Sequence, residues 1–208
     1  MRIFLVRHGE TEWNRINRFQ GISDISLNTK GKAQVEALAH ALKNETIDVV
    51  YSSPLIRAGE TAKAIRHFHP SSLYFEEEGL KEMDLGDFEG MDATHWAKQY
   101  PEFKKKWRES PSSIKLPGGE SLKGVQIRAV KTLERIIQNH SPETTLLICS
   151  HNFVIHAILC HALEISLDNF REIKQETAAL NLLDKCDDRL VVEKVNEVSH
   201  LQHLNQQT

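Results

Sequence analysis

The stretch FLVRHGETEWN, residues 4–14, indicates how the chain folds and where its chemistry lies. The apolar run at 3–6 predicts a short buried strand, and the chain then changes abruptly to Arg7, His8 and, two residues on, Glu10. In parallel α/β sheets, ligands bind beyond the carboxyl ends of the strands. The junction is therefore either part of a binding site or a strand that simply ends at the surface, and the rest of the sequence distinguishes the two.

Length and composition restrict the class of protein. With 208 residues, the chain is long enough for one domain with a substantial core. It is 40% hydrophobic and carries a formal net charge of -3, which favours neither disorder nor a nucleic-acid or membrane partner. No apolar run is long enough for a membrane span or a signal-peptide core, so we expect a cytoplasmic protein. The three cysteines form no CxxC motif and are expected to be buried free thiols.

Apolar periodicity predicts strands that alternate with helices along most of the chain. Strands are expected over residues 3–6, 47–51, 72–75 and 144–150, and two late strands over 177–185 and 189–195 are joined by a turn at Asp187–Asp188. Helices are expected over residues 27–45, 53–68, 121–139 and 152–163, with caps at Asn28 or Thr29, at Ser53 and at Ser121. This order predicts an α/β fold, a three-layer α/β/α sandwich around a mostly parallel sheet. From Ser199 onward there is no pattern, and we expect the tail to fray.

Residues 80–120 are less regular than the rest. They lack an apolar periodicity of their own, so we expect a single domain over 1–208 with an excursion around 80–120 that caps the substrate side. The basic run FKKKWRE at 103–109 indicates a solvated helix face, with a basic lid over an anionic substrate as the alternative.

Polar side chains follow the expected strands where each strand ends. Arg7 and His8 follow the first strand, Arg57 lies one turn into the helix after the second, and His151 follows the strand at 144–149. If these strands are neighbours, the side chains meet at one edge of the sheet. Paired guanidiniums and helix N-termini bind phosphate or carboxylate, and a histidine held beside them can attack phosphorus. The pattern therefore predicts a phosphate site.

Attack on a phosphoester also needs an acid to protonate the departing oxygen. The stretch FEEEGLKEMDLGDFEG at 75–90 is rich in carboxyl groups. The residues alone do not select among Glu76, Glu77, Glu78, Glu82 and Glu89.

A metal site is not expected from the histidines. His151, His156 and His161 are spaced by five residues, which places them on different faces of a helix, whereas zinc ligands must converge. The pair in HFH at 67–69 is expected at the surface. The PGGES segment at 117–121 lacks the lysine of a P-loop and predicts a turn with a helix cap.

Ordered motifs resemble the histidine phosphatase superfamily, in its phosphoglycerate mutase-like branch 1. The resemblance rests on LVRHGETEWN, RFQGISDISLNTKGKAQ, VVYSSPLIRAGETA, LKEMDLGDFEG, LLICSHN and KVNEVSHL, which follow one another over nearly the whole chain. It implies a phosphoglycerate mutase-like fold and a phosphatase that needs neither a metal nor an organic cofactor.

The resemblance also implies roles for individual residues. His8 corresponds to the phosphorylated nucleophile, and Glu82 to the proton donor. The rest of the phosphate pocket corresponds to Arg7, Arg57 and His151. Residues implied in substrate binding are Asn14, Gln20, Gly21 and Asn152. For His8 to attack, its other ring nitrogen must be held, and we expect a backbone carbonyl to hold it. For Glu82 to act as an acid, a carboxylate-rich or apolar setting must raise its pKa.

The substrate implied is a small phosphomonoester, with phosphoserine and α-ribazole phosphate as the examples that the motifs favour. A cofactor-dependent phosphoglycerate mutase is the alternative, although such mutases are usually longer and follow the second histidine with Gly-Asn, where this chain has Asn152–Phe153. A regulatory module that binds phosphate without catalysis is a further alternative, and the joint presence of His8, Glu82, Arg57 and His151 argues against it. The late strands offer an edge that could pair with a second copy in a homodimer.

Overall fold

A six-stranded sheet forms the centre of the protein, in a computed structural model that describes residues 1–187 and 189–204. The strands are β1 (Arg2–Arg7), β2 (Val49–Ser52), β3 (Leu73–Glu76), β4 (Thr145–Ser150), β5 (Leu180–Cys186) and β6 (Arg189–Glu197), in the spatial order β3-β2-β4-β1-β5-β6. The first four of these run parallel, and β5 and β6 add an antiparallel hairpin beside β1. The predicted strands and the predominantly parallel sheet are confirmed, while Asp188 of the predicted turn lies outside the described residues.

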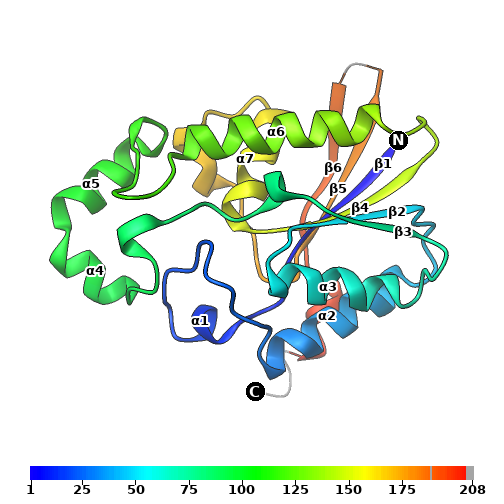
Figure 1. Cartoon of the computed structure of the whole chain (residues 1–208), viewed down its shortest axis with the longest axis horizontal. Coiled ribbons are helices and arrows are strands. Elements are labelled where there is room, and N and C mark those ends of the chain that lie inside the picture. Colours follow the sequence, from blue (N-terminus) through cyan, green and yellow to red (C-terminus); the bar gives the residue numbers. More distant parts are fainter. Residues whose placement is uncertain (188, 205–208) are drawn as a thin grey trace.

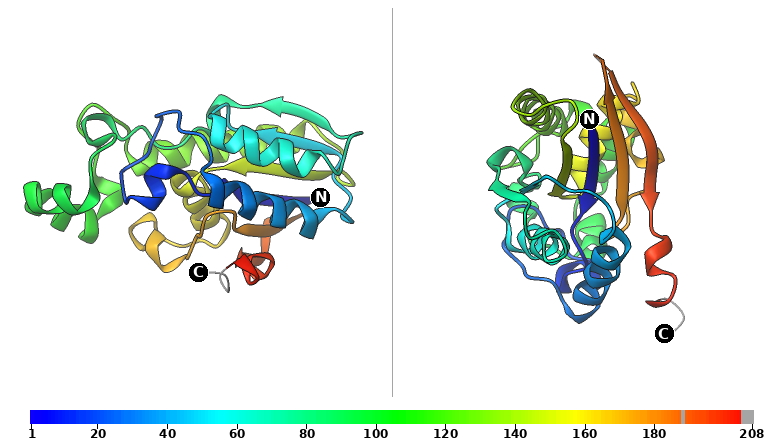
Figure 2. Two further views of the ribbon diagram at one scale, coloured as in Figure 1. Left: turned by 90° about the horizontal axis from the view of Figure 1, so that it is seen from below. Right: turned by 90° about the vertical axis from the view of Figure 1, so that its right-hand side faces the viewer.

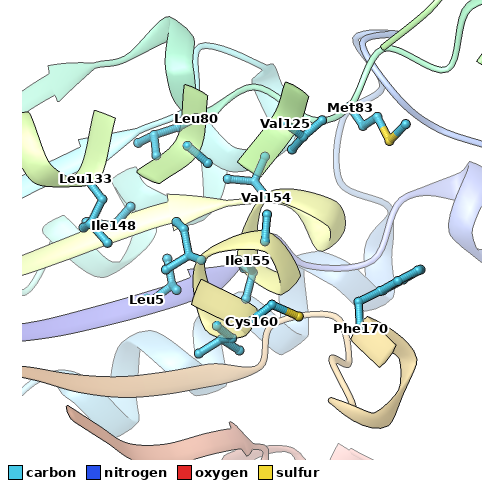
Figure 3. Close-up of a cluster of buried hydrophobic side chains, with 14 of the residues drawn as sticks. Leu5, Leu80, Met83, Val125, Leu133, Ile148, Val154, Ile155, Cys160 and Phe170 are labelled. Atoms are coloured by element: carbon cyan, nitrogen blue, oxygen red, sulfur yellow. The ribbon is translucent and has the colours of Figure 1, made fainter. Parts of the chain in front are cut away.

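Helices cover both faces of this sheet (Figures 1 and 2). On one face, α2 (Thr29–Leu42) and α3 (Ile56–Arg66) pack on Phe4 and Val6 of β1. On the other, α6 (Leu122–Gln138) and α7 (Asn152–Ala162) pack on Leu5 of β1 and Ile148 of β4, as Figure 3 shows. Alternate residues of β1 thus serve two separate apolar cores, as the period of a strand requires. The three-layer α/β/α sandwich is confirmed.

Pairing within the parallel part brings the predicted strand ends together. Arg7 lies opposite Ser150 where β1 pairs with β4, and Ser52 lies opposite Cys149 where β2 pairs with β4. The carboxyl ends of β1, β2 and β4 therefore meet at one edge, which is the arrangement that a shared site requires.

Between β3 and α6 the chain leaves the sheet. This excursion contains α4 (Ala93–Gln99) and α5 (Pro101–Glu109), which lie beyond the end of the sheet where α1 (Glu12–Arg15) is also found (Figure 1). Aromatic rings from separate turns pack together here, Phe88 against Phe103 at 5.0 Å and Trp96 against Phe19 at 5.1 Å between ring centroids. Because these contacts come from scattered rings, no apolar period marks the segment in the sequence.

Several local expectations are corrected. The helix α3 begins at Ile56 rather than at Ser53, because the Ser53 hydroxyl contacts His151 instead of capping the helix. Residues 199–204 of the tail do not simply fray, since Ser199–Leu201 form a 3-10 turn with Leu201 buried against α2, and residues 205–208 lie outside the described part of the chain. Cys186 is exposed, unlike Cys149 and Cys160.

The histidine pair at 67–69 is only partly at the surface, because His69 is buried whereas His67 is exposed. Among the residues described, no helix is long and apolar enough to cross a membrane.

Candidate active site

His8 lies at the carboxyl end of β1 and is 2% exposed. Its backbone is fixed on both sides, since its N–H donates to Ser150 and its carbonyl accepts from Ala178. The ring Nδ1 lies 2.7 Å from the carbonyl oxygen of Gly9, its neighbour along the chain. A carbonyl can only accept, so Nδ1 carries the proton and Nε2 keeps its lone pair. The expectation of a backbone carbonyl partner is confirmed, and His8 presents a nucleophilic nitrogen.

Gly9 is required where this segment meets α2. A Cβ at Gly9 would lie 2.6 Å from the carbonyl oxygen of Gly31 and 2.7 Å from the side chain of Val35. The helix therefore packs directly on the backbone that follows His8, which keeps the imidazole in place.

Two arginines face the same region. Arg57 is fully buried, and its Nη1 and Nη2 donate to the carbonyl oxygens of Ser23 and Gly21 at 2.8 and 2.7 Å. Arg7 donates through Nη1 to the carbonyl oxygen of Gln175 at 2.5 Å. In each guanidinium Nε is buried without a partner in the described part of the chain. Burial lowers the pKa of Arg57 to about 10, which leaves it a cation at neutral pH, and burial also lowers the pKa of Arg7.

His151 lies across from His8, with ring centroids 5.2 Å apart. Its Nε2 is 2.7 Å from the Ser53 hydroxyl oxygen, and that oxygen also accepts the Leu55 N–H. A serine hydroxyl can donate to Nε2 or accept from it, and we take it as the donor, which places the proton of the neutral ring on Nδ1, facing the cluster. Within the described residues Nδ1 has no partner although it is buried. Burial lowers the pKa of His151, and the positive charge of Arg57 lowers it further. The ring is therefore a neutral donor toward the cluster.

Glu82 is 3% exposed and supplies the carboxyl group. Its Oε1 accepts the N–H groups of Met83 and Phe153 at 2.9 and 3.1 Å. Burial raises the pKa of Glu82, while the two backbone donors, Arg57 and Arg7 oppose that rise. Of the two settings expected to raise it, the structure supports removal from water, because burial is the largest cause of the shift.

A half-buried arginine that sequence reasoning missed holds this segment. Arg128, on α6, donates to the backbone carbonyls of Gly79, Lys81 and Glu82 at 2.7 to 3.0 Å. It also makes a bidentate contact with Glu120, whose other contact is the Asp84 N–H. The pair is distant from Glu82 in sequence and carries no motif, so only the fold reveals that it positions the acid.

The residues implied in substrate binding fall into three places. The Asn14 side-chain oxygen accepts from Thr11, and the Thr11 hydroxyl donates to Gln20, so these groups form a network with one another. The carbonyl oxygen of Gly21 accepts a hydrogen bond from Arg57. A Cβ at Gly21 would lie 2.4 Å from the carbonyl oxygen of Met83. Asn152 opens α7 directly after His151. In the described residues, Gly21 alone of these hydrogen-bonds to the buried cluster.

The His8 cluster comes together from the ends of β1 and β4, from the first turn of α3 and from the segment after β3, and it consists of Arg7, His8, Arg57, Glu82 and His151. Burial lowers the pKa of His8, and the charges of Arg57 and Arg7 lower it further. The carboxyl group of Glu82 acts on both arginines by raising their pKa values. The cluster thus combines a neutral nucleophile, a carboxyl group with a raised pKa, and unpaired N–H donors. That set can bind a tetrahedral anion, accept its phosphorus atom and protonate its leaving oxygen.

Comparisons with known proteins point the same way. The sequence profile of the histidine phosphatase superfamily (branch 1) matches residues 3–198. Phosphoserine phosphatase 1 of Hydrogenobacter thermophilus is 34% identical over 201 residues, which cover 97% of this chain and 94% of the relative. A 2,3-bisphosphoglycerate-dependent phosphoglycerate mutase of Gloeobacter violaceus is 30% identical over 178 residues, with 84% and 81% covered. Bacillus stearothermophilus YhfR has a similar solved structure, with a TM-score of 0.90, 27% identity and coverage of 97% and 99%.

Proposed function

Since the chain belongs to branch 1 of the histidine phosphatase superfamily and is a phosphatase, we propose that it hydrolyses a small phosphomonoester through a phosphohistidine on His8. Glu82 serves as general acid and then as general base. The observation that carries this proposal is a group of three buried nitrogens that have no partner among the described residues, Arg7 Nε, Arg57 Nε and His151 Nδ1, around a histidine whose Nε2 is unprotonated. Buried donors without partners are costly unless a ligand satisfies them.

In the first step, His8 Nε2 attacks phosphorus and the bond to the leaving oxygen breaks. Glu82 gives its proton to that oxygen, so the alcohol leaves neutral. Arg7, Arg57 and His151 bind the other phosphoryl oxygens, where negative charge is concentrated in the transition state. In the second step, Glu82 takes a proton from water, which attacks the phosphohistidine and releases inorganic phosphate.

Phosphoserine is a candidate substrate on the strength of the phosphatase relative, and α-ribazole phosphate remains a second candidate from the sequence motifs. The steps above use only protein side chains, so we propose that no metal is needed. Phosphoglycerate mutase activity is the competing proposal, which the mutase relative supports. Phe153 weighs against it, because an aromatic ring stands directly after Asn152 near the acid.

The central test compares the wild type, His8→Ala and the control His95→Ala, which removes an exposed histidine, on p-nitrophenyl phosphate in EDTA. We expect His8→Ala to lower kcat/KM by about 10⁴-fold or more and the control to change it little. Acid-labile, base-stable phosphate on the wild type would identify the phosphohistidine. Equal rates for His8→Ala and the wild type would refute the nucleophile, and loss of activity in EDTA would refute the metal-free mechanism.

The competing activity has its own measurement. The protein is supplied with 3-phosphoglycerate and 2,3-bisphosphoglycerate, and 2-phosphoglycerate and inorganic phosphate are followed together. We expect phosphate to form faster, and faster formation of 2-phosphoglycerate would make the protein a mutase.

A further inference from the structure

An aromatic cavity of about 330 Å³ lies beside the His8 cluster. Its apolar lining consists of Phe19, Leu85, Phe88, Trp96, Trp107, Leu116 and Phe153. Three of these adjoin proposed site residues, since Phe19 precedes Gln20, Leu85 follows Glu82 by three positions, and the Phe153 N–H donates to the Glu82 carboxyl group at 3.1 Å. The cavity therefore adjoins the carboxyl group that is proposed to protonate the leaving oxygen.

The walls of the aromatic cavity are pre-formed. The ring of Trp107 packs edge-on against Phe153 at 6.2 Å, and the rings of Phe88 and Trp96 pack edge-on at 5.6 Å. These rings come from α4, α5, α7 and the segment after Glu82, so each fixes another across the cavity. Such a site gains most from a ligand body that is apolar and large enough to displace its water.

Cations line the same cavity. Lys104 and Arg108 come from α5, and Arg171 comes from the 3-10 turn after α7. None of the three forms a salt bridge among the residues described. Instead, the Arg171 guanidinium carbon lies 4.4 Å from the ring centroid of Phe170 and 5.8 Å from that of Trp107. Repulsion from Arg108 adds to burial in lowering the pKa of Arg171. An anion here would relieve that repulsion, and an ammonium group would increase it.

We propose that the aromatic cavity is the binding site for the leaving group. The preferred substrate of the protein is then a phosphomonoester whose alcohol has an aromatic or bulky apolar body with a negative charge at its far end. This rests on the proposed function and narrows its substrate class. Phosphoserine fits poorly, because it has no apolar body and its ammonium group offsets the attraction of its carboxylate for Arg108 and Arg171. A carboxylate at the far end of an aryl body would meet those cations instead.

The test uses phosphate esters of primary alcohols, so that the leaving oxygen stays comparable. Ethyl phosphate, 2-phenylethyl phosphate, its para-carboxylate and its para-aminomethyl analogue are compared with phosphoserine by kcat/KM. We expect the phenyl group to raise kcat/KM by about 10- to 100-fold over ethyl, as burial of one ring allows. The carboxylate should add about 2- to 5-fold at low salt, and high salt should remove that gain.

Charge reversal separates a specific site from general damage. Arg108→Glu changes an exposed side chain for which no hydrogen bond is found among the described residues. Lys105→Glu is the control, because it makes the same charge change on α5 at a residue that does not line the cavity. We expect Arg108→Glu to reverse the preference, so that the aminomethyl ester becomes better than the carboxylate, while Lys105→Glu keeps the wild-type order. Trp107→Ala should lower kcat/KM for 2-phenylethyl phosphate toward the value for ethyl phosphate.

Each outcome bears on one proposal alone. If His8→Ala abolishes every reaction but the wild type prefers phosphoserine or treats ethyl and 2-phenylethyl phosphate alike, the aromatic cavity is not the leaving-group site and the proposed function stands. An unchanged order in Arg108→Glu would overturn the anionic preference. If His8→Ala retains all activities, the proposed function itself fails.

Discussion

The His8 cluster is built on strand ends inside the sandwich, whereas the aromatic cavity beside it is walled largely by short helices outside the sheet. In the cluster, each side chain has at least one fixed backbone or hydroxyl partner, as His8 has Gly9 and His151 has Ser53. In the cavity, the contacts are between rings, and the cations have no acidic partner in the described chain.

This difference separates chemistry from selectivity. Strand ends are held by the sheet and by two apolar cores, so they fix reacting groups within narrow limits. A wall of helices and turns can change its side chains without disturbing the sheet. Changes in the cluster should therefore affect every substrate, and changes at the cavity should affect only the choice among substrates.

Replacing the acid should give the largest effect. Glu82→Gln keeps an oxygen that can accept from Met83 and Phe153 but has no proton to donate. We expect kcat/KM for ethyl phosphate, which reports only the steps up to release of the alcohol, to fall about 10²- to 10⁴-fold. For p-nitrophenyl phosphate the fall should be much smaller, because nitrophenolate leaves without a proton. An equal fall for both esters would show that Glu82 is not the acid.

The same variant tests the pH dependence. Burial raises the pKa of Glu82, so the carboxyl group keeps its proton to higher pH and wild-type activity falls as pH rises through that pKa. Burial lowers the pKa of His8, so activity falls on the acid side only as pH drops through that lowered value. Glu82→Gln should lose the alkaline fall and keep the acid one, as measured by kcat/KM against pH.

Loss of a phosphate ligand comes next. Arg57→Met removes a fully buried cation whose Nε has no partner in the described chain, and we expect kcat/KM to fall about 10²- to 10³-fold for all esters alike. Orthovanadate at 100 times its Kd should add about 2.7 kcal/mol to the free energy of unfolding of the wild type and so raise its Tm. The Tm of Arg57→Met should rise far less. Selective loss for one ester would place Arg57 in substrate choice instead.

The contrast between the two regions also explains what the sequence reveals. Strands and helices with apolar periods were predictable, and so were the caps at Asn28 and Ser121, because those signals are local. The start of α3 was not, since the Ser53 side chain contacts His151, which is 98 residues away. The walls of the cavity carry no local signal, because their rings meet only in the fold.

For the candidate site, the alternation of strands and helices was enough to predict that Arg7, His8, Arg57 and His151 lie at converging strand ends. The choice of Glu82 came from the family resemblance and not from the residues, since burial, which sets its pKa, is a property of the fold. The contact of Arg128 with the Glu82 carbonyl was invisible for the same reason.

A smaller effect is expected when the tautomer of His151 is released. In Ser53→Ala, Nε2 of His151 loses the hydroxyl, and the ring is free to carry its proton on either nitrogen. We expect kcat/KM to fall about 2- to 10-fold for all esters, and Ser53→Thr, which keeps a hydroxyl, to recover part of it. A ¹⁵N spectrum of the imidazoles should show the proton of His151 on Nδ1 in the wild type and a mixture in Ser53→Ala. An unchanged spectrum would mean that Ser53 does not set the tautomer.

The smallest effect on chemistry should come from the ring cluster behind the cavity. Phe103→Ala removes a partly buried ring whose centroid lies 5.0 Å from that of Phe88 and 6.1 Å from that of Trp96, and among the described residues it forms no ring pair with the His8 cluster. We expect the free energy of unfolding to fall by about 1–2 kcal/mol, compared with about 2–5 kcal/mol for Leu5→Ala in the core beneath β1. Hydrolysis of ethyl phosphate should change by less than about 2-fold, since that ester does not use the rings.

Hydrogen exchange measures the same independence directly. Phe103→Ala should speed exchange at the amides of α4 and α5 and leave those of β1 and β4 as in the wild type, because local opening outside the sheet does not require the sheet to open. Faster exchange at β1, together with slower hydrolysis of ethyl phosphate, would mean that the helices beyond the sheet also hold His8 in place, and selectivity could not then be changed without cost to the chemistry.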